Sequence, residues 1–199
     1  KKNKITHLSG TASFVDKQNI KVQSSKELTL SAKNFIIATG SSSMERPGIT
    51  VDEKQIITST GALSLSTVPK TMLVIGGGYI GLEMGSVWSR LGTKVTVVEK
   101  LDRIVPTMDG EIATEFMKSL QKQGIEFKLS HKVVATKSVS KDVEVTMESE
   151  KDKKQIKNKF NVVLMSIGRK PNTEELNLEK IGVKLNDQQA IEVDKQYKT

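Results

Sequence analysis

The stretch that decides the fold is residues 72–99, MLVIGGGYIGLEMGSVWSRLGTKVTVVE. It opens with the apolar run Met72–Ile75, as expected of a parallel strand that is buried on both faces. A glycine triplet with the spacing Gly-x-Gly-x-x-Gly follows, and apolar residues then recur at helical intervals until Gly92, which is placed to end a helix. A second apolar run, 95–98, leads to Glu99. The order of strand, glycine turn, helix, strand and acid is that of a dinucleotide-binding unit.

Each residue of this pattern has a chemical reason to be there. Gly76 permits a tight turn, Gly78 lets the backbone approach a diphosphate with no Cβ in the way, and Gly81 lets the helix pack closely on the strand. The amino end of the helix offers unpaired N–H groups and a partial positive charge to phosphates. Glu99 can accept hydrogen bonds from an adenosine ribose diol. The alternative, a glycine-rich turn without a ligand, does not require the strand, the helix and the acid together.

The composition is typical of a soluble globular protein, with 36% hydrophobic and 27% charged residues among 199. No apolar run approaches the roughly 18 residues that cross a bilayer, so no membrane is expected among the partners. The sequence contains no cysteine, which excludes a disulfide or a thiol nucleophile within it. His7 and His131 have no second ligand at metal-binding spacing, so we expect surface residues and no metal site. The first residue is lysine rather than methionine, and we therefore expect a piece of a longer protein.

The formal net charge of +8 raises the question of nucleic-acid binding. The densest basic stretch is 151–159, which contains no arginine, and only 4% of the chain is aromatic. Stacking platforms for bases are therefore lacking. We interpret 151–159 as a solvated hairpin turn and expect no nucleic-acid partner.

The segments around the central pattern predict further elements. Short strands are expected over 11–15, 19–22 and 28–30, followed by a more apolar strand over 35–38 that ends in a glycine turn. Beyond Glu99, Asp109 can cap a helix that stops at Gly124, and 125–129 should be a third parallel strand. The remaining expected elements are antiparallel strands at 133–135 and 143–147, a last buried strand at 162–167, one short helix after Pro171, and an amphipathic strand near Ile191.

Seven segments of the sequence resemble the dihydrolipoamide dehydrogenases, a group of flavin-linked pyridine nucleotide-disulfide oxidoreductases. The segments are IIATGS (36–41), PGI (47–49), TSTGALSL (58–65), VIGGGYIGLEMGSVWSRLG (74–92), VTVVE (95–99), LQKQGIEFKL (120–129) and IGRKPNT (167–173). The resemblance runs through essentially the whole chain and implies a parent enzyme that reoxidises protein-bound dihydrolipoamide through a disulfide and FAD to NAD. It also implies a homodimer within a 2-oxo acid dehydrogenase complex, in the bacterial cytoplasm or the mitochondrial matrix.

The resemblance covers only part of that family's pattern. The glycine fingerprint for FAD, the redox-active cysteine pair and the dimerisation domain with its histidine–glutamate pair have no counterpart in this sequence. The expected fold is therefore α/β, a Rossmann-like NAD domain with a parallel sheet and an inserted antiparallel meander, flanked by partial β-rich FAD-domain segments. The expected boundaries are 1–49 for a partial FAD-binding domain, 50–68 for a linker or crossing, 69–168 for the NAD-binding domain and 169–199 for a return segment. No catalytic residue is expected, and the piece alone should bind NAD(H) without catalysis.

The resemblance also assigns cofactor contacts. Those expected for NAD are Gly76, Gly77, Gly78, Tyr79, Ile80, Gly81, Glu83, Glu99, Val133 and Gly168. Among them Glu83 is either a contact near the nicotinamide ribose or a residue that stabilises the helix dipole. Val133 is either an adenine contact or plain core, and Gly168 should lie beside the nicotinamide.

The family's flavin-contacting turn matches Thr39, Gly40 and Ser41, so these are the residues expected to meet FAD in the parent protein. Ala12 stands where many relatives have a glycine near the adenine of FAD, which weakens that contact.

Two other functions stay open. One is a free-standing NAD-responsive regulatory domain, against which the matches to FAD-domain segments argue. The other is a different NAD(P)H-linked flavin disulfide reductase. Glu99 argues against NADP because its carboxylate would repel a 2′-phosphate, although Lys100 and Arg103 can soften that repulsion.

Overall fold

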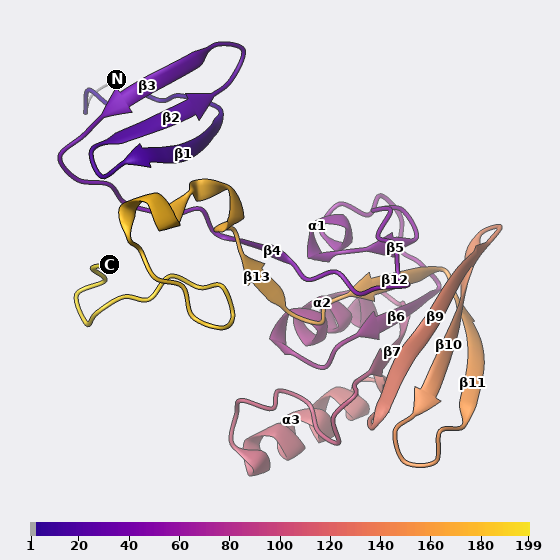
Figure 1. Cartoon of the computed structure of the whole chain (residues 1–199). Coiled ribbons are helices and arrows are strands. Elements are labelled where there is room, and N and C mark those ends of the chain that lie inside the picture. The colour runs from indigo at the N-terminus through magenta and orange to yellow at the C-terminus, as the bar shows by residue number, and fades with distance from the viewer. Residues whose placement is uncertain (1–2) are drawn as a thin grey trace. The chain divides into compact units, whose positions relative to one another are not determined.

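The computed structural model describes residues 3–199, and its chain contacts divide it into two compact units. Unit 1 comprises Lys1–Ser42 together with Arg169–Thr199, and unit 2 comprises Ser43–Gly168. Figure 1 shows the elements of both units. Unit 2 contains the glycine triplet and is described first.

A five-stranded parallel sheet forms the centre of unit 2. Its strand order is β5-β12-β6-β7-β8, with bounds Ile56–Ile57 (β5), Val162–Met165 (β12), Thr71–Ile75 (β6), Lys94–Val98 (β7) and Glu126–Lys128 (β8). Met72, Leu73 and Val74 in β6 are all 0% exposed. The continuous apolar runs are therefore strands covered on both faces, as predicted, because both sides of a pleated strand lie against core.

Three helices accompany this sheet, α1 (Ser59–Ala62), α2 (Tyr79–Arg90) and α3 (Gly110–Lys122). Helix α2 ends as predicted, because Gly92 takes a left-handed φ of 104° and the N–H of Thr93 returns to the carbonyl of Trp88 at 3.0 Å. The predicted cap of α3 is also confirmed, since the Asp109 carboxylate accepts the backbone N–H of Glu111 at 2.9 Å.

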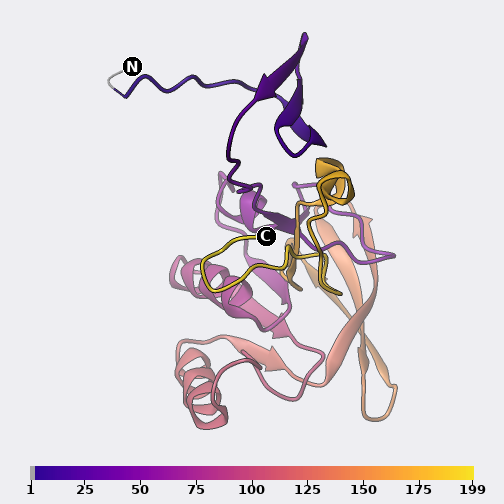
Figure 2. The same ribbon diagram turned by 60° about the vertical axis from the view of Figure 1, so that its left-hand side comes forward.

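A three-stranded antiparallel meander covers the other face of the sheet. Its strands are β9 (His131–Val139), β10 (Asp142–Ser149) and β11 (Gln155–Phe160), with β10 in the middle. Figure 2 shows α2 and α3 on one side of the sheet and the meander on the other. Alternate residues of the sheet face the two cores: Met72 and Val74 pack with the helices, whereas Leu73 and Ile75 pack with the meander.

The interpretation of 151–159 as a hairpin turn was wrong in its second half. The turn lies before β11, and Gln155–Phe160 pairs with β10 in the register Met147↔Ile156 to Val143↔Phe160. The burial pattern of β11 is exposed up to its last residue, Phe160. Lysines are compatible with β11 because the exposed side chains of an edge strand can be polar. Their positive charge also discourages pairing with other chains.

Residues 50–68 differ from the linker that we expected, because they contribute β5 and α1 to unit 2. The Asp52 carboxylate fixes the backbone that leads into β5 by accepting three backbone N–H groups, from Lys54, Gln55 and Ile56, at 2.8–2.9 Å. Burial alone would raise the pKa of the Asp52 carboxyl, but these three donors together hold it below its usual value.

Unit 1 is built from small sheets. The three short strands predicted first are confirmed as β1 (Thr11–Asp16), β2 (Asn19–Gln23) and β3 (Glu27–Ser31), which form an antiparallel meander, and β4 (Ser41–Ser43) pairs with β13 (Arg169–Pro171). Two 3-10 helices, η1 (Glu174–Leu176) and η2 (Leu178–Ile181), carry the buried residues Leu176 and Leu178 and share a core with Phe14 of β1. The ring of Phe14 meets that of Phe35 edge to face at 5.2 Å.

Two predictions for unit 1 were wrong. Residues 35–38 form no strand, and Ile36 is 95% exposed. Their composition suits a strand, but within residues 3–199 no neighbouring strand supplies the hydrogen bonds. The strand expected near Ile191 is only an isolated bridge between Leu185 and Ile191.

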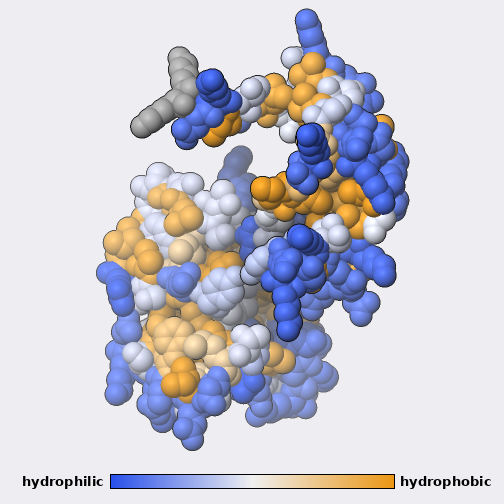
Figure 3. Space-filling view, turned by 90° about the vertical axis from the view of Figure 1, so that its left-hand side faces the viewer, coloured by the Kyte–Doolittle hydropathy of each residue, from blue (hydrophilic) through white to orange (hydrophobic). Residues whose placement is uncertain are grey.

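On the face that Figure 3 shows, hydrophobic residues form several patches among hydrophilic ones. Over residues 3–199, none of the helices combines the length and the hydropathy that crossing a membrane requires.

Candidate dinucleotide-binding site

The glycine turn joins the carboxyl end of β6 to the amino end of α2. Gly76 has a φ of +106°, and a Cβ built on it would lie 2.5 Å from the backbone oxygen of Ser166. Its N–H donates to the carbonyl of Val98 in the neighbouring strand at 2.9 Å. Both the backbone conformation and the lack of space therefore require glycine at this position.

The other two glycines of the triplet have contrasting surroundings. Gly78 is the N-cap of α2, with φ −79° and ψ 173°, and a Cβ added to it would meet nothing within 4 Å. A Cβ on Gly81 would lie 2.5 Å from the carbonyl oxygen of Gly76 and 2.5 Å from Oγ of Ser166. Gly81 thus permits close packing of helix on strand, whereas the free space belongs to Gly78.

Glu99 lies beside the turn, at the end of β7. Its Oε2 accepts the N–H of Gly77 at 2.6 Å, and its Oε1 accepts the N–H of Leu101 at 2.8 Å. An ionised carboxylate has about four acceptor positions, so each oxygen keeps a lone pair for a further donor. The two backbone bonds fix the carboxylate in one place, next to the amino end of α2.

A pocket of about 250 Å³ opens at the carboxyl ends of β6 and β7. Its wall includes Gly76, Glu99, Lys100, Val133, His131 and Arg46. Val133 is 0% exposed and belongs to the meander core as well as to this wall, so both interpretations of this residue are compatible with its position. Ligands of open parallel sheets gather at this edge of the strands.

His131 is a wall residue that the sequence did not reveal, because we expected it on the open surface. It is half-buried, and its Nδ1 lies 2.6 Å from the carbonyl oxygen of Leu129. A carbonyl can only accept, so this bond requires a proton on Nδ1. The only sequence signal was its place two residues before Val133. No group of three or more side chains suited to holding a metal occurs among the described residues, 3–199.

The basic residues around Glu99 have different roles. Arg103 donates to the carbonyl of Pro106 at 2.5 Å and lies outside the pocket wall, whereas Lys100 lines it. Lys132 also lines the pocket but is paired with two carboxylates of the meander, Glu148 at 3.0 Å and Glu150 at 3.3 Å. Hydrogen bonds to Glu148 and then Glu150 raise the pKa of Lys132.

The remaining expected NAD contacts, on α2 and after β12, are not part of this pocket wall. Tyr79 begins α2 and is 66% exposed, Ile80 is half-buried, and Glu83 is exposed just beyond the first turn of the helix. Because Glu83 lies outside that first turn, its position argues against a role in stabilising the helix dipole. Gly168 has a φ of +135°, and its carbonyl accepts the N–H of Met44 at 2.9 Å.

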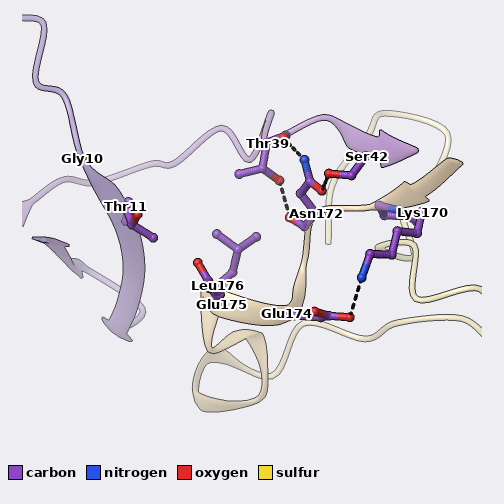
Figure 4. A pocket seen from close by; sticks show the side chains of 11 residues that line it. Gly10, Thr11, Thr39, Ser42, Lys170, Asn172, Glu174, Glu175 and Leu176 are labelled. Carbon is purple, nitrogen blue, oxygen red and sulfur yellow. Dashed lines mark hydrogen bonds and ion pairs between the residues drawn. The ribbon is translucent and has the colours of Figure 1, made fainter. Parts of the chain in front are cut away.

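The expected flavin turn lies in unit 1 (Figure 4). Oγ1 of Thr39 donates to the carbonyl of Asn172 at 2.7 Å, and the Asn172 amide returns a bond to the Thr39 carbonyl at 3.1 Å. The N–H of Asn172 donates to Gly40 at 3.0 Å, and Arg169 binds Oγ of Ser41 at 2.7 Å. Asn172 therefore holds the turn in place, although its chemistry was not anticipated from the sequence.

A pocket of about 530 Å³ adjoins this turn within unit 1. Thr39, Ala12 and Asn172 lie in its wall. The expected flavin turn and the strand that carries Ala12 thus face one cavity.

Comparison with known proteins gives one consistent picture. The family model described as "Pyridine nucleotide-disulphide oxidoreductase" matches residues 1–199. The chain is 48% identical to the mitochondrial dihydrolipoyl dehydrogenase of Schizosaccharomyces pombe and 46% identical to the leghemoglobin reductase of Glycine max, in each case over 100% of the chain. It spans 40% and 38% of the lengths of these two proteins.

Solved structures agree with this picture. The HOCl-induced flavoprotein disulfide reductase RclA from Escherichia coli, as a Cu(II) complex, superposes with a TM-score of 0.83 at 30% identity, over 94% of this chain and 42% of that one. LpdA from Mycobacterium tuberculosis gives 0.82 at 26% identity, over 94% and 41%. The α/β fold expected from the sequence is confirmed, and the chain belongs to the pyridine nucleotide-disulphide oxidoreductase family.

Proposed function

We propose that unit 2 binds NAD(H). The observation that carries this proposal is the open space at Gly78, directly at the amino end of α2 and next to the fixed carboxylate of Glu99. A glycine whose missing Cβ would meet no protein atom has no packing reason to be glycine. A diphosphate at that position supplies one, because it can approach the backbone N–H groups closely only if no side chain intervenes.

In this proposal, different residues contact different parts of the dinucleotide. The amino end of α2 receives the diphosphate, with Gly77, Tyr79 and Ile80 around it. Glu99 accepts hydrogen bonds from the hydroxyl groups of the adenosine ribose, and Val133 contacts the adenine. Gly168 and Glu83 lie toward the nicotinamide half. The nicotinamide ring supplies the hydride chemistry, and this chain's residues bind and orient it.

For the whole protein we propose a dihydrolipoamide dehydrogenase that works as a homodimer in a 2-oxo acid dehydrogenase complex, in the mitochondrial matrix or the bacterial cytoplasm. Relatives with that name, several of them mitochondrial, support this assignment. Thr39, Gly40 and Ser41 would form one edge of the FAD site in that protein. Disulfide exchange would need cysteines outside this sequence, because the chain contains none.

A second candidate is another flavin disulfide reductase of the family. It is favoured by relatives named leghemoglobin reductase, which are 45–46% identical to this chain and thus nearly as similar as the dihydrolipoyl dehydrogenases. Comparing the full-length gene product on dihydrolipoamide and on leghemoglobin would separate the two. A free-standing regulatory domain is the third, and a gene without FAD fingerprint or cysteine pair would support it.

The test for the chain itself is a titration of the purified protein with NADH, followed through energy transfer from Trp88, the single tryptophan, which lies on α2. We expect NADH binding, no retained flavin after incubation with FAD and gel filtration, and no oxidation of dihydrolipoamide, because the chain has no thiol to carry the reaction. Failure to bind NADH would contradict the proposal for unit 2. A retained yellow flavin with turnover would contradict the expected lack of catalysis.

A further inference from the structure

Arg46 is held in the wall of the unit 2 pocket by a tight turn. Residues 46–49, Arg-Pro-Gly-Ile, have the sequence of a type II turn, with proline second and Gly48 third at φ +85°. The N–H of Ile49 closes the turn on the carbonyl of Arg46 at 3.1 Å. Ile49 is 5% exposed and packs in the core with Ile75 and Val98, so the backbone of Arg46 is anchored beside the ends of β6 and β7.

In the part of the chain that the structure describes, the Arg46 guanidinium has no protein partner. Within residues 3–199 it forms no ion pair within 4 Å and no side-chain hydrogen bond, although Glu99 lies in the same wall. The Glu99 carboxylate accepts the N–H groups of Gly77 and Leu101 instead of the guanidinium. Lys132, the neighbouring cation of the wall, is neutralised by the two meander carboxylates. Arg46 is therefore a half-buried cation that is left free to meet an anion.

The chemistry of that anion follows from the fork of the guanidinium. Five N–H donors in one plane match the oxygens of a phosphate group better than a single point charge does. The pocket wall joins Arg46 to Gly76, the first residue of the turn at which the diphosphate is expected. Lys100, by contrast, is exposed and comes directly after Glu99, the residue that we expect to bind the ribose.

We propose that Arg46 is a coenzyme-positioning residue that donates hydrogen bonds to the diphosphate of the bound dinucleotide. This inference rests on the proposed function of unit 2 and adds a side-chain cation to a site otherwise made of backbone N–H groups. It assigns a coenzyme-binding role to residue 46, which the sequence placed in the partial FAD-binding domain expected over 1–49. The partial charge of one helix end and a full charge opposite it would then hold the diphosphate from two sides.

The test compares the dissociation constants of NADH, NADPH and adenosine for the wild-type chain, Arg46→Gln, Arg46→Lys and Arg90→Gln. Arg90 lies in the last turn of α2 and outside the pocket wall, so Arg90→Gln removes the same charge elsewhere. We expect Arg46→Gln to weaken NADH binding roughly tenfold and Arg46→Lys to recover only part of the loss. Adenosine, which has no phosphate, should bind all four proteins alike, and Arg90→Gln should bind NADH as the wild type does.

Each other outcome overturns the inference in a recognisable way. If the wild type binds NADH and Arg46→Gln binds it within a factor of two, Arg46 has no positioning role and the proposed function stands. If Arg46→Gln and Arg90→Gln lose affinity equally, only net charge matters. If adenosine binding falls as much as NADH binding, Arg46 supports the pocket as a whole and not the diphosphate, and the inference is wrong. A loss confined to NADPH would place the contact at the 2′-phosphate, and a wild type that binds no NADH removes the proposed function itself.

Discussion

The second and third glycines of the pattern can be separated by experiment, because Gly78 and Gly81 have opposite surroundings. Gly78 has a backbone conformation that any residue adopts and free space around it. Replacing Gly78 with valine should cost the folded state only about 1 kcal/mol, mainly because apolar residues are poorer N-caps than glycine. The same valine fills the space in which the diphosphate is expected.

The magnitude of the binding loss follows from the bonds that the valine would prevent. A phosphate at the amino end of α2 accepts charge-assisted hydrogen bonds of about 1.5–3 kcal/mol each. Losing two of them weakens NADH binding by at least about 100-fold, since each 1.4 kcal/mol is a factor of ten. We therefore expect Gly78→Val to fold and not to bind.

Gly81→Ala should behave differently. Its Cβ would lie 2.5 Å from a backbone oxygen, and backbone cannot rotate away as a long side chain can. Overpacking of this kind costs about 1–3 kcal/mol, against which alanine regains at most about 1 kcal/mol of helix propensity. We expect a net loss in the free energy of unfolding for Gly81→Ala.

Both variants can be measured with one fluorophore. Trp88 is 8% exposed, so its emission reports urea unfolding as well as energy transfer to NADH. A folded Gly78→Val protein with unchanged NADH affinity would show that the diphosphate lies elsewhere. Gly81→Ala with wild-type stability would show that the helix can move away from β6, and that the close approach is not required.

Three further predictions concern other residues of unit 2. The wild type should bind NADH more tightly than NADPH, because a carboxylate about 4 Å from a 2′-phosphate costs about 4 kcal/mol at an effective dielectric constant of about 20, before screening by salt. In calorimetry, Glu99→Gln should reduce the difference between the two affinities, and equal affinities in the wild type would refute the role of Glu99. Ser166→Ala should lower the free energy of unfolding by about 1 kcal/mol, because Oγ donates to the carbonyl of Ile75 at 2.9 Å, and urea titration would reveal an unchanged midpoint if that bond contributes nothing. The pKa of Asp52 is lowered in the folded protein because its three backbone N–H donors outweigh burial, so its contribution to the free energy of unfolding is complete above the unfolded value of 3.8 and is lost as pH falls through the lower folded value. The free energies of unfolding of the wild type and Asp52→Asn should therefore differ at neutral pH and converge in acid. A difference that stays constant with pH would contradict this linkage.

Local pattern was sufficient to predict the central part of unit 2. The runs 72–75 and 95–98 are strands because apolar side chains on both faces can be buried only inside a covered sheet. The caps at Asp109 and Gly92 depend on the chemistry of one residue and its immediate neighbours, and both were confirmed. Elements of this kind contain their own signal.

The errors share a different cause. Residues 35–38 are apolar enough for a strand, but a strand exists only where a neighbour supplies hydrogen bonds, and composition does not show whether one is present. Residues 155–159 were interpreted as part of a turn because the lysines of this stretch suggested exposure to solvent. An edge strand is also solvated, so charge alone could not separate the two cases.

Residues far apart in sequence were the hardest to assign to a site. Asn172 meets Thr39 across 133 positions, and Arg46 reaches the pocket from a segment that precedes the parallel sheet's main strands. Neither carries a motif, because an asparagine or an arginine is ordinary at a surface. Only the fold shows that Asn172 holds the turn expected to meet FAD, and that Arg46 lies in a pocket wall beside a carboxylate bonded to backbone N–H groups.

The glycine pattern itself illustrates how much a local motif leaves unsaid. Gly76 and Gly81 are required by the same neighbour, Ser166, whose backbone oxygen and Oγ fill the space that two Cβ atoms would occupy. Ser166 follows β12, so the pattern is tight only because β12 lies beside β6 in the sheet. Gly78 lacks such a neighbour, and its free space is what makes a ligand the best reason for its presence. Two glycines of one motif are thus required by the protein's own packing, and the third is explained by the dinucleotide that we propose unit 2 binds, so substitutions at the two kinds of position should separate stability from affinity.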